Sequence, residues 1–235
     1  MSDELGIPQH TRFGWTPDLP DYRDHAYRVS FVDPSTLPAK VDLREAFPPV
    51  YDQGNLGSCT AQAIAAMMEY NQRKQALKRF TPSRLFIYYF ERLILGTVAS
   101  DSGAMIRDGI KVVAKNGAPP EPHWPYVIAK FTKHPTKSAM LRAQGHVAVS
   151  YERLQPDLLH LKDCLASGYP FVFGFSVYSS FQTAEVARTG TGLMPQPGDR
   201  CLGGHAVLAV GYDDATGMFL MRNSWGDRWG QAGYF

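Results

Sequence analysis

Three stretches in the first half of the chain carry apolar residues at helical spacing. In 59–75 the apolar positions recur three and four residues apart within an alanine-rich sequence, which predicts a helix. A second helix is predicted over SRLFIYYFERLIL, with Thr81 as its N-cap and Pro82 at its first position. A third is predicted from Ser102 to Asn116, and Gly117 provides its C-terminal stop.

The pattern changes after about residue 144. HVAVSYERL and FVFGFSVY have the composition of strands, and PDLLHLKDCLAS between them predicts a short helix. HAVLAVGY and MFLMRNSW flank the turn sequence DDATG, which predicts an antiparallel hairpin. A helical half followed by antiparallel strands predicts an α+β chain in two lobes with a groove between them.

The chain therefore divides into an arm and one two-lobe domain. Residues 1–40 are rich in proline and charge and lack a long periodicity, which indicates an extended N-terminal arm. Its aromatic residues Trp15, Tyr22 and Tyr27 are large groups to leave in water, so the arm is expected to lie against the body. Residues 41–143 are predicted to form the mainly helical lobe and 144–235 the mainly β lobe.

Composition narrows the function classes. A net charge of +2 over 235 residues gives no sustained basic face, so we expect no nucleic-acid partner. No window approaches an unbroken apolar membrane span, and the N-terminus MSDELGIPQH does not resemble a secretory signal. Three widely spaced cysteines, Cys59, Cys164 and Cys201, favour neither a disulfide framework nor a zinc site. We expect a monomer without metal or cofactor in a reducing compartment, the cytoplasm.

Cys59 stands where a turn-rich loop becomes a helix. The unpaired N–H groups of a helix start stabilise a thiolate, which is the nucleophilic form of cysteine. Gln53, six residues earlier, is able to direct its side-chain NH2 toward the same place as an oxyanion-hole donor. The alternative is a small buried cysteine that only packs at the helix start.

A nucleophilic thiol needs a base, and the base needs a group that orients it. His146 and His205 each follow a glycine and open a predicted strand, whereas the other histidines lie in the arm, among prolines or on a helix. If 206–212 pairs with 218–224, His205 faces Ser224 and lies beside Asn223. An asparagine there can accept from the imidazole and fix its tautomer, so His205 is preferred to His146. Trp225 is then placed to shield that hydrogen bond from water.

Three motifs together resemble the papain family of cysteine proteases. They are Q-x5-C ending in GSC before a helix, GGHAV, and NSWGxxWG, and the resemblance runs from about residue 41 to the end of the chain. It implies a papain-like fold and a peptide or protein substrate hydrolysed by acyl transfer. It further implies that Cys59 is the nucleophile, His205 the general base and acid, Asn223 the orienting residue and Gln53 an oxyanion-hole donor.

The same resemblance implies where a peptide binds. Ser102 and Gly103 occupy the place of the edge that binds the substrate backbone in extended form. The residues expected near the S2 pocket are Met105, Gly174, Gly203 and Gly204.

The sequence departs from the family in ways that point to a subgroup. Leu56 stands where a cysteine usually precedes the nucleophile, and Thr60 where an aromatic residue usually follows it. Together with the missing disulfide partners, this indicates a bacterial branch without bridges. The arm is expected to act as a short propeptide or lid over the cleft. The alternatives are a catalytically silent peptide-binding module, a transpeptidase or amidase with the same residues, and a metal-binding protein.

Overall fold

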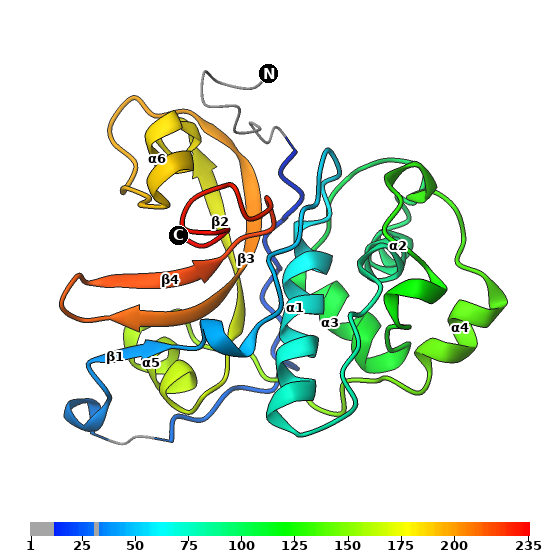
Figure 1. Ribbon diagram of the computed structural model, residues 1–235, viewed down its shortest axis with the longest axis horizontal. Coiled ribbons are helices and arrows are strands. Elements are labelled where there is room, and N and C mark those ends of the chain that lie inside the picture. Colours follow the sequence, from blue (N-terminus) through cyan, green and yellow to red (C-terminus); the bar gives the residue numbers. More distant parts are fainter. Residues whose placement is uncertain (1–11, 31–32) are drawn as a thin grey trace.

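The computed structural model of the chain describes residues 12–30 and 33–235. The start of the predicted arm, with His10, lies outside these residues. Figure 1 shows helices α1–α4 gathered in one lobe and the strands, with α5 and α6, in the other. The α+β two-lobe prediction is confirmed.

Along the chain, β1 is followed by α1–α5, and β2, α6, β3 and β4 come after them. The helices are α1 Cys59–Lys74, α2 Arg84–Ile94, α3 Ile106–Lys115, α4 Lys137–Ala143, α5 Leu158–Ala166 and α6 Ala184–Thr189. The strands are β1 Lys40–Asp42, β2 Phe171–Tyr178, β3 Cys201–Asp213 and β4 Met218–Arg222. Short 3₁₀ turns occur at Pro34–Thr36, Arg44–Ala46, Glu121–His123, Ile128–Lys130 and Ser179–Gln182. No helix in the described part of the chain is long and apolar enough to cross a membrane.

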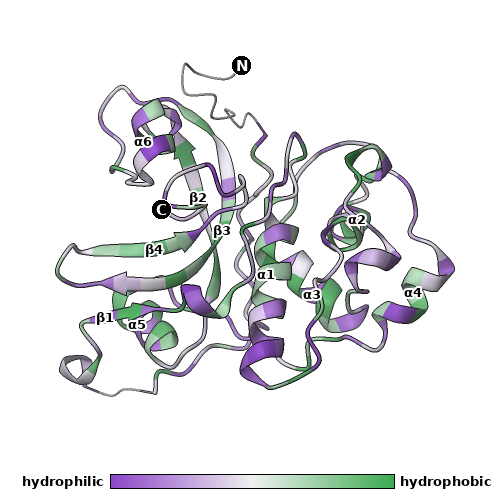
Figure 2. Ribbon diagram, in the orientation of Figure 1, coloured by the Kyte–Doolittle hydropathy of each residue, from purple (hydrophilic) through white to green (hydrophobic). Residues whose placement is uncertain are grey.

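β3 is the longest strand and holds the sheet together. It pairs antiparallel with β1, β2 and β4, so it carries the interior of the β lobe. Its residues from His205 to Tyr212 are all buried. Figure 2 shows β4 and much of β3 as mainly hydrophobic, as expected of strands that cover a core.

α1 is buried on two sides because it lies between the lobes. Ile64 and Ala65 belong to the core of the helical lobe, with Phe86 of α2. Ala63 and Ala66 pack instead against β3, where they contact the cluster around Leu208. Small side chains on this second face let the helix approach the sheet closely, which brings the start of α1 to the centre of the molecule.

The described part of the arm runs between the two lobes (Figure 1). The Trp15 N–H donates to the Gly204 carbonyl at 2.9 Å, and the Ala104 N–H donates to the Gly14 carbonyl at 2.7 Å. Further along, Asp24 forms an ion pair of 2.6 Å with Arg107 of α3. The expectation that the arm lies against the body is confirmed for Trp15 and for Tyr27, whose hydroxyl donates to Asp163. It is wrong for Tyr22, which is 98% exposed.

Two predicted helix starts are wrong. α2 begins at Arg84 with Ser83 as its N-cap, because the Ser83 hydroxyl accepts from the Phe86 N–H at 3.2 Å. Pro82 instead forms an isolated bridge with Pro120. α3 begins at Ile106, because Met105 before it is extended and the backbone of Ala104 bonds to the arm.

The predicted strand HVAVSYERL is also wrong. No element of the described sheet lies beside residues 146–154, and Val149 is 95% exposed. The Ala148 N–H donates to the Val113 carbonyl, and Arg153 pairs with the arm at Ala26. Alternating apolar residues therefore mark an extended surface segment here, not a strand.

The predicted hairpin is present with a register shifted by one or two residues. Asp213 pairs with Met218 across a turn in which Gly217 has φ of +67°. An irregularity between Ala209 and Gly211 then changes the register by one residue, so that Leu208 faces Arg222. The sequence pattern does not reveal this bulge, because the extra residue of a bulge leaves the run of apolar residues in HAVLAVGY uninterrupted.

Candidate active site

Cys59 is the first residue of α1 and is fully buried. The loop before it turns sharply, with Gly54 at φ of +57°, a conformation that favours glycine. The Cys59 Sγ accepts a hydrogen bond from the N–H of Ala206 at 3.4 Å. The start of α1 in one lobe and the strand residue that follows His205 in the other therefore lie in direct contact.

His205 is fully buried in β3 and is held on two sides. Its Nε2 lies 2.8 Å from the Asn223 Oδ1. Since an amide oxygen only accepts, Nε2 carries a proton in this contact, and Nδ1 of the neutral ring is the nitrogen that can accept one. Trp225 stacks on the imidazole with ring centroids 4.7 Å apart and an interplanar angle of 26°. Trp225 is itself only 3% exposed, so it shields the hydrogen bond between the histidine and the asparagine.

Gln53 lies in the same crevice because its loop is tied to the segment after β4. Its N–H donates to the Ser224 carbonyl at 2.9 Å, and its Oε1 accepts from the Ser224 hydroxyl at 2.7 Å. The amide group is thereby fixed with its NH2 donating, at 2.9 Å to Leu56 and at 3.4 Å to the carbonyl of Arg12. The structure therefore brings together the four side chains predicted from the motifs, Cys59, His205, Asn223 and Gln53.

The arm covers the sulfur. Gly14 is buried and directs its backbone N–H to Cys59, while Phe13 lies against the rings of His205 and Trp225 at centroid distances of 6.3 Å. Burial raises the pKa of the Cys59 thiol to about 11, and the N–H groups of Ala206 and Gly14 offset only part of that effect. The expected lowering of the thiol pKa by the helix start is therefore outweighed while the arm is in place.

The predicted substrate-binding residues meet the arm in different ways. A Cβ on Gly103, which has φ of +71°, would lie 2.3 Å from the Gly14 carbonyl oxygen, so the edge is built for close approach of a backbone. Gly174 and Gly204 leave room for the Trp15 ring, since a Cβ on Gly174 would lie 2.1 Å from it.

Three other predicted positions lie at the margin of this contact. Gly203 lies against Phe13 instead of Trp15. Ser102 bonds to Thr97 and to its own neighbour, and the backbone bonds to the arm come from Ala104. Met105 immediately precedes α3, and no described contact places it against the Trp15 ring.

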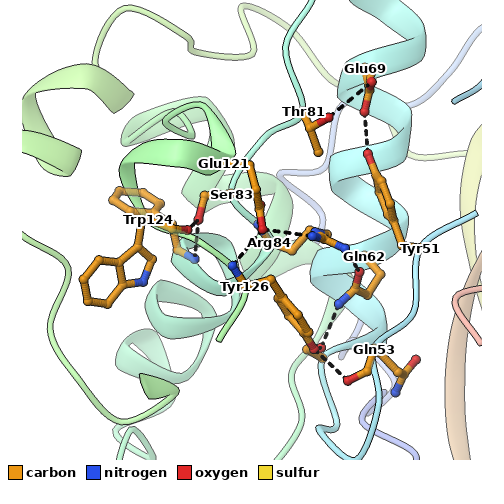
Figure 3. A network of polar contacts seen from close by, with 12 residues as sticks. Tyr51, Gln53, Gln62, Glu69, Thr81, Ser83, Arg84, Glu121, Trp124 and Tyr126 are labelled. Atoms are coloured by element: carbon orange, nitrogen blue, oxygen red, sulfur yellow. Dashed lines mark hydrogen bonds and ion pairs between the residues drawn. The ribbon is translucent and has the colours of Figure 1, made fainter. Parts of the chain in front are cut away.

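Ser224 and Tyr126 were missed by the sequence analysis. Ser224 fixes the Gln53 amide, and the Tyr126 hydroxyl donates to the Gln53 carbonyl at 2.9 Å (Figure 3). Ser224 lies inside the NSWG motif, so that motif held a signal for it. Tyr126 follows an irregular proline-rich stretch with no signal at all. Within the described ranges, no group of three histidine, cysteine or acidic side chains is arranged to hold a metal ion.

Comparison with known proteins agrees with this geometry. Residues 37–235 match the family described as papain family cysteine protease. An uncharacterized peptidase C1-like protein of Acanthamoeba polyphaga mimivirus is 38% identical over 95% of this chain and 80% of its own length. A cathepsin B-like protein of Giardia intestinalis is 29% identical over 92% of the chain and 74% of its own.

Solved structures agree on the fold and on the subgroup. Xylellain, a cysteine protease from Xylella fastidiosa, has a TM-score of 0.88 and 44% identity, covering 97% of this chain and 90% of its own. Digestive procathepsin L 3 of Tenebrio molitor shares the fold at a TM-score of 0.70 and 21% identity, over 96% and 69% of the two chains. All three cysteines are free, as expected of a branch without bridges. The chain belongs to the papain family of cysteine proteases and is a peptide hydrolase similar to bacterial xylellain.

Proposed function

We propose that Cys59, His205 and Asn223 carry out the hydrolysis through an acyl-thioester. The Cys59 thiol gives its proton to His205 Nδ1, and the sulfur attacks the carbonyl carbon of the scissile peptide. The C–N bond breaks as His205 returns the proton to the leaving amine, and an acyl-thioester remains on Cys59. Water then attacks the thioester with His205 as the base, which releases the carboxylic acid and restores the thiol.

One observation carries this proposal. The Cys59 sulfur bonds to the residue next to His205 at 3.4 Å, while the far nitrogen of that imidazole is held at 2.8 Å by Asn223. Gln53 and the N–H of Cys59 supply the donors for the oxyanion, because the Gln53 NH2 already donates to a carbonyl of the chain that occupies the cleft.

Turnover of a fluorogenic peptide tests these roles. Cys59→Ser is expected to lower kcat/KM by at least about 10³-fold, and His205→Ala by a similar factor, because the nucleophile and base act as a unit. Cys201→Ser removes an exposed thiol outside the site and is expected to leave turnover unchanged. If Cys59→Ser kept wild-type turnover, the proposed mechanism would be wrong.

We further propose that the arm occupies the cleft as an inhibitory segment. The backbone N–H of Gly14 is directed toward the Cys59 sulfur, so the arm lies at the proposed nucleophile. The backbone of Trp15 forms a parallel β-bridge with that of Ala104, and the Trp15 ring fills the space next to Gly174. Arm and substrate therefore compete for one edge and one pocket.

Trp15→Ala tests the inhibitory role in the full chain. Full burial of a Leu or Phe side chain contributes about 1.5–3 kcal/mol, and we take the same range for the larger, half-buried Trp15. Its loss should shift the equilibrium toward an open cleft by roughly ten- to a hundredfold and raise the initial rate of peptide turnover accordingly. Tyr22→Ala is the matched control, because Tyr22 is an aromatic residue of the same arm that is 98% exposed. Equal initial rates for the wild type and Trp15→Ala would refute inhibition by the arm.

A further inference from the structure

The two donors of the proposed oxyanion hole lie at opposite ends of one short loop. Gln53 supplies its side-chain amide at one end, and Cys59 supplies its backbone N–H at the other. The hole works only if the two donors keep a fixed spacing, since a donor must lie about 2.7–3.1 Å from the developing oxyanion. The contacts that hold the two ends of this loop therefore determine the spacing of the two donors.

The hydroxyl of Tyr126 contacts both ends of the loop. The Tyr126 Oη lies 2.9 Å from the Gln53 carbonyl oxygen and 2.6 Å from the Ser58 Oγ, next to the nucleophile. A carbonyl only accepts, so the one phenol proton goes to Gln53, and the Ser58 hydroxyl donates to Tyr126. Burial raises the pKa of Tyr126, so the phenol keeps that proton.

The direction of each hydrogen bond is fixed by the residues behind Tyr126. The Gln62 NH2 donates to Ser58 at 3.1 Å, and the Gln62 Oε1 accepts from Arg84 at 3.4 Å. Arg84 also forms an ion pair of 2.9 Å with Glu121. Figure 3 shows this chain of side chains from the Arg84–Glu121 pair to the Tyr126 phenol and Gln53.

The network closes on Tyr126 itself. The same Glu121 Oε1 accepts from the backbone N–H of Tyr126 at 2.7 Å, and the Arg84 guanidinium lies 4.7 Å from the centre of the Tyr126 ring. Gln53, Ser58 and Gln62 are at most 1% exposed. Water therefore does not reach these three side chains, whereas Tyr126, Arg84 and Glu121 are partly exposed. A hydrogen bond lost at the buried end of the network is not replaced by one to water.

We propose that Tyr126 is a positioning residue that sets the spacing between Gln53 and Cys59. It does not touch the reacting atoms. It acts on the transition state through the loop, so its loss should lower kcat more than it changes KM. This inference rests on the proposed catalytic roles of Gln53 and Cys59.

Tyr126→Phe removes the hydroxyl and keeps the ring that packs against Arg84. We expect kcat for a fluorogenic peptide to fall about ten- to a hundredfold, while KM changes less than twofold. Tyr51→Phe is the matched control, because Tyr51 stacks on the same guanidinium at 4.5 Å but gives its hydroxyl to Glu69, away from the loop. We expect Tyr51→Phe to retain the wild-type kcat.

Two further measurements separate positioning from a general structural role. In a Gln53→Ala background, Tyr126→Phe should lower kcat by less than a further twofold, because the donor it positions is already gone. In the Trp15→Ala background, which opens the cleft, the alkylation rate of Cys59 by iodoacetamide should be unchanged by Tyr126→Phe, since that reaction forms no oxyanion. Should the phenylalanine variant fail to fold, Ser58→Ala breaks the same bridge from its other end and should lower kcat in the same way.

The outcomes are distinct. An active wild type with an equally active Tyr126→Phe would overturn the positioning role and leave the proposed mechanism standing. The positioning role would also be wrong if the fall in kcat of the double variant equalled the product of the falls caused by Tyr126→Phe and by Gln53→Ala alone. Absence of turnover in both the wild type and Trp15→Ala would overturn the proposed catalytic mechanism and, with it, the positioning role of Tyr126.

Discussion

At the scale of single residues, Glu91 is a buried carboxyl group outside the cleft. It is fully buried in α2 and accepts a hydrogen bond of 2.8 Å from the hydroxyl of Thr60, the residue after Cys59. Burial raises the pKa of Glu91 to about 8, and the nearby carboxylate of Asp108 adds to the effect. Thr60 stands where the family usually has an aromatic residue, and the hydrogen bond from its hydroxyl opposes part of this rise in the pKa of Glu91. Near neutral pH the Glu91 carboxyl is therefore mostly protonated.

This raised pKa predicts how stability depends on pH. Between the unfolded pKa of about 4.3 and the folded pKa of about 8, the folded state binds more protons than the unfolded state. The free energy of unfolding should therefore decrease as pH rises, by up to roughly 1.4 kcal/mol per pH unit. Glu91→Gln keeps an acceptor for Thr60 but cannot ionise, so it should lack this component. Urea unfolding at pH 5 to 8 checks this, and parallel profiles for the two proteins would contradict it.

At the scale of elements, the sequence predicted those whose signals are local. α1, α5 and β2 follow from spacing and composition alone. The start of α2 did not, because Thr81-Pro82 resembles a helix start while the actual cap is chosen by a tertiary contact. Ser83 is fully buried and donates to the Trp124 carbonyl at 2.5 Å, in addition to capping the helix.

This difference between two neighbouring hydroxyls is measurable. Ser83→Ala should lower the free energy of unfolding by about 1–3 kcal/mol, since it removes a cap and leaves a buried carbonyl without its partner. Thr81→Ala should cost no more than about 0.5 kcal/mol, because the Thr81 hydroxyl makes only a long contact of 3.5 Å with Glu69. Equal losses in the two variants would mean that the helix start predicted from the sequence was energetically correct after all.

The candidate site was predictable to the extent that its residues lie in motifs. Cys59, His205 and Asn223 were found because each motif stands at the end of an element that is itself predictable. Tyr126 was not, because only the folded path of the loop brings it to Gln53. The register of the hairpin was also wrong by one or two residues, yet the contact between His205 and Asn223 survives, because Asn223 lies beyond the end of β4 and reaches the imidazole with its side chain.

At the scale of the whole molecule, two lobes and one arm meet at Cys59. The sulfur lies on α1, which packs on both lobes, and the histidine lies on β3, the strand that joins the sheet. The arm crosses this junction and is fastened beyond it by the ion pair between Asp24 and Arg107. A covered thiol with a raised pKa and an intact histidine–asparagine pair is what we expect of an enzyme held in a closed state until the arm is displaced.

The most direct measurement is the labelling of Trp15→Ala by an epoxide-type thiol inhibitor, read by mass spectrometry. We expect one label per chain on Cys59, and its loss when His205→Ala is added. Cys201, the exposed thiol, serves as the internal control for reactivity that needs no activation. Labelling of Cys201 in preference to Cys59, or labelling of Cys59 at the same rate without His205, would contradict the claim that the imidazole activates this sulfur.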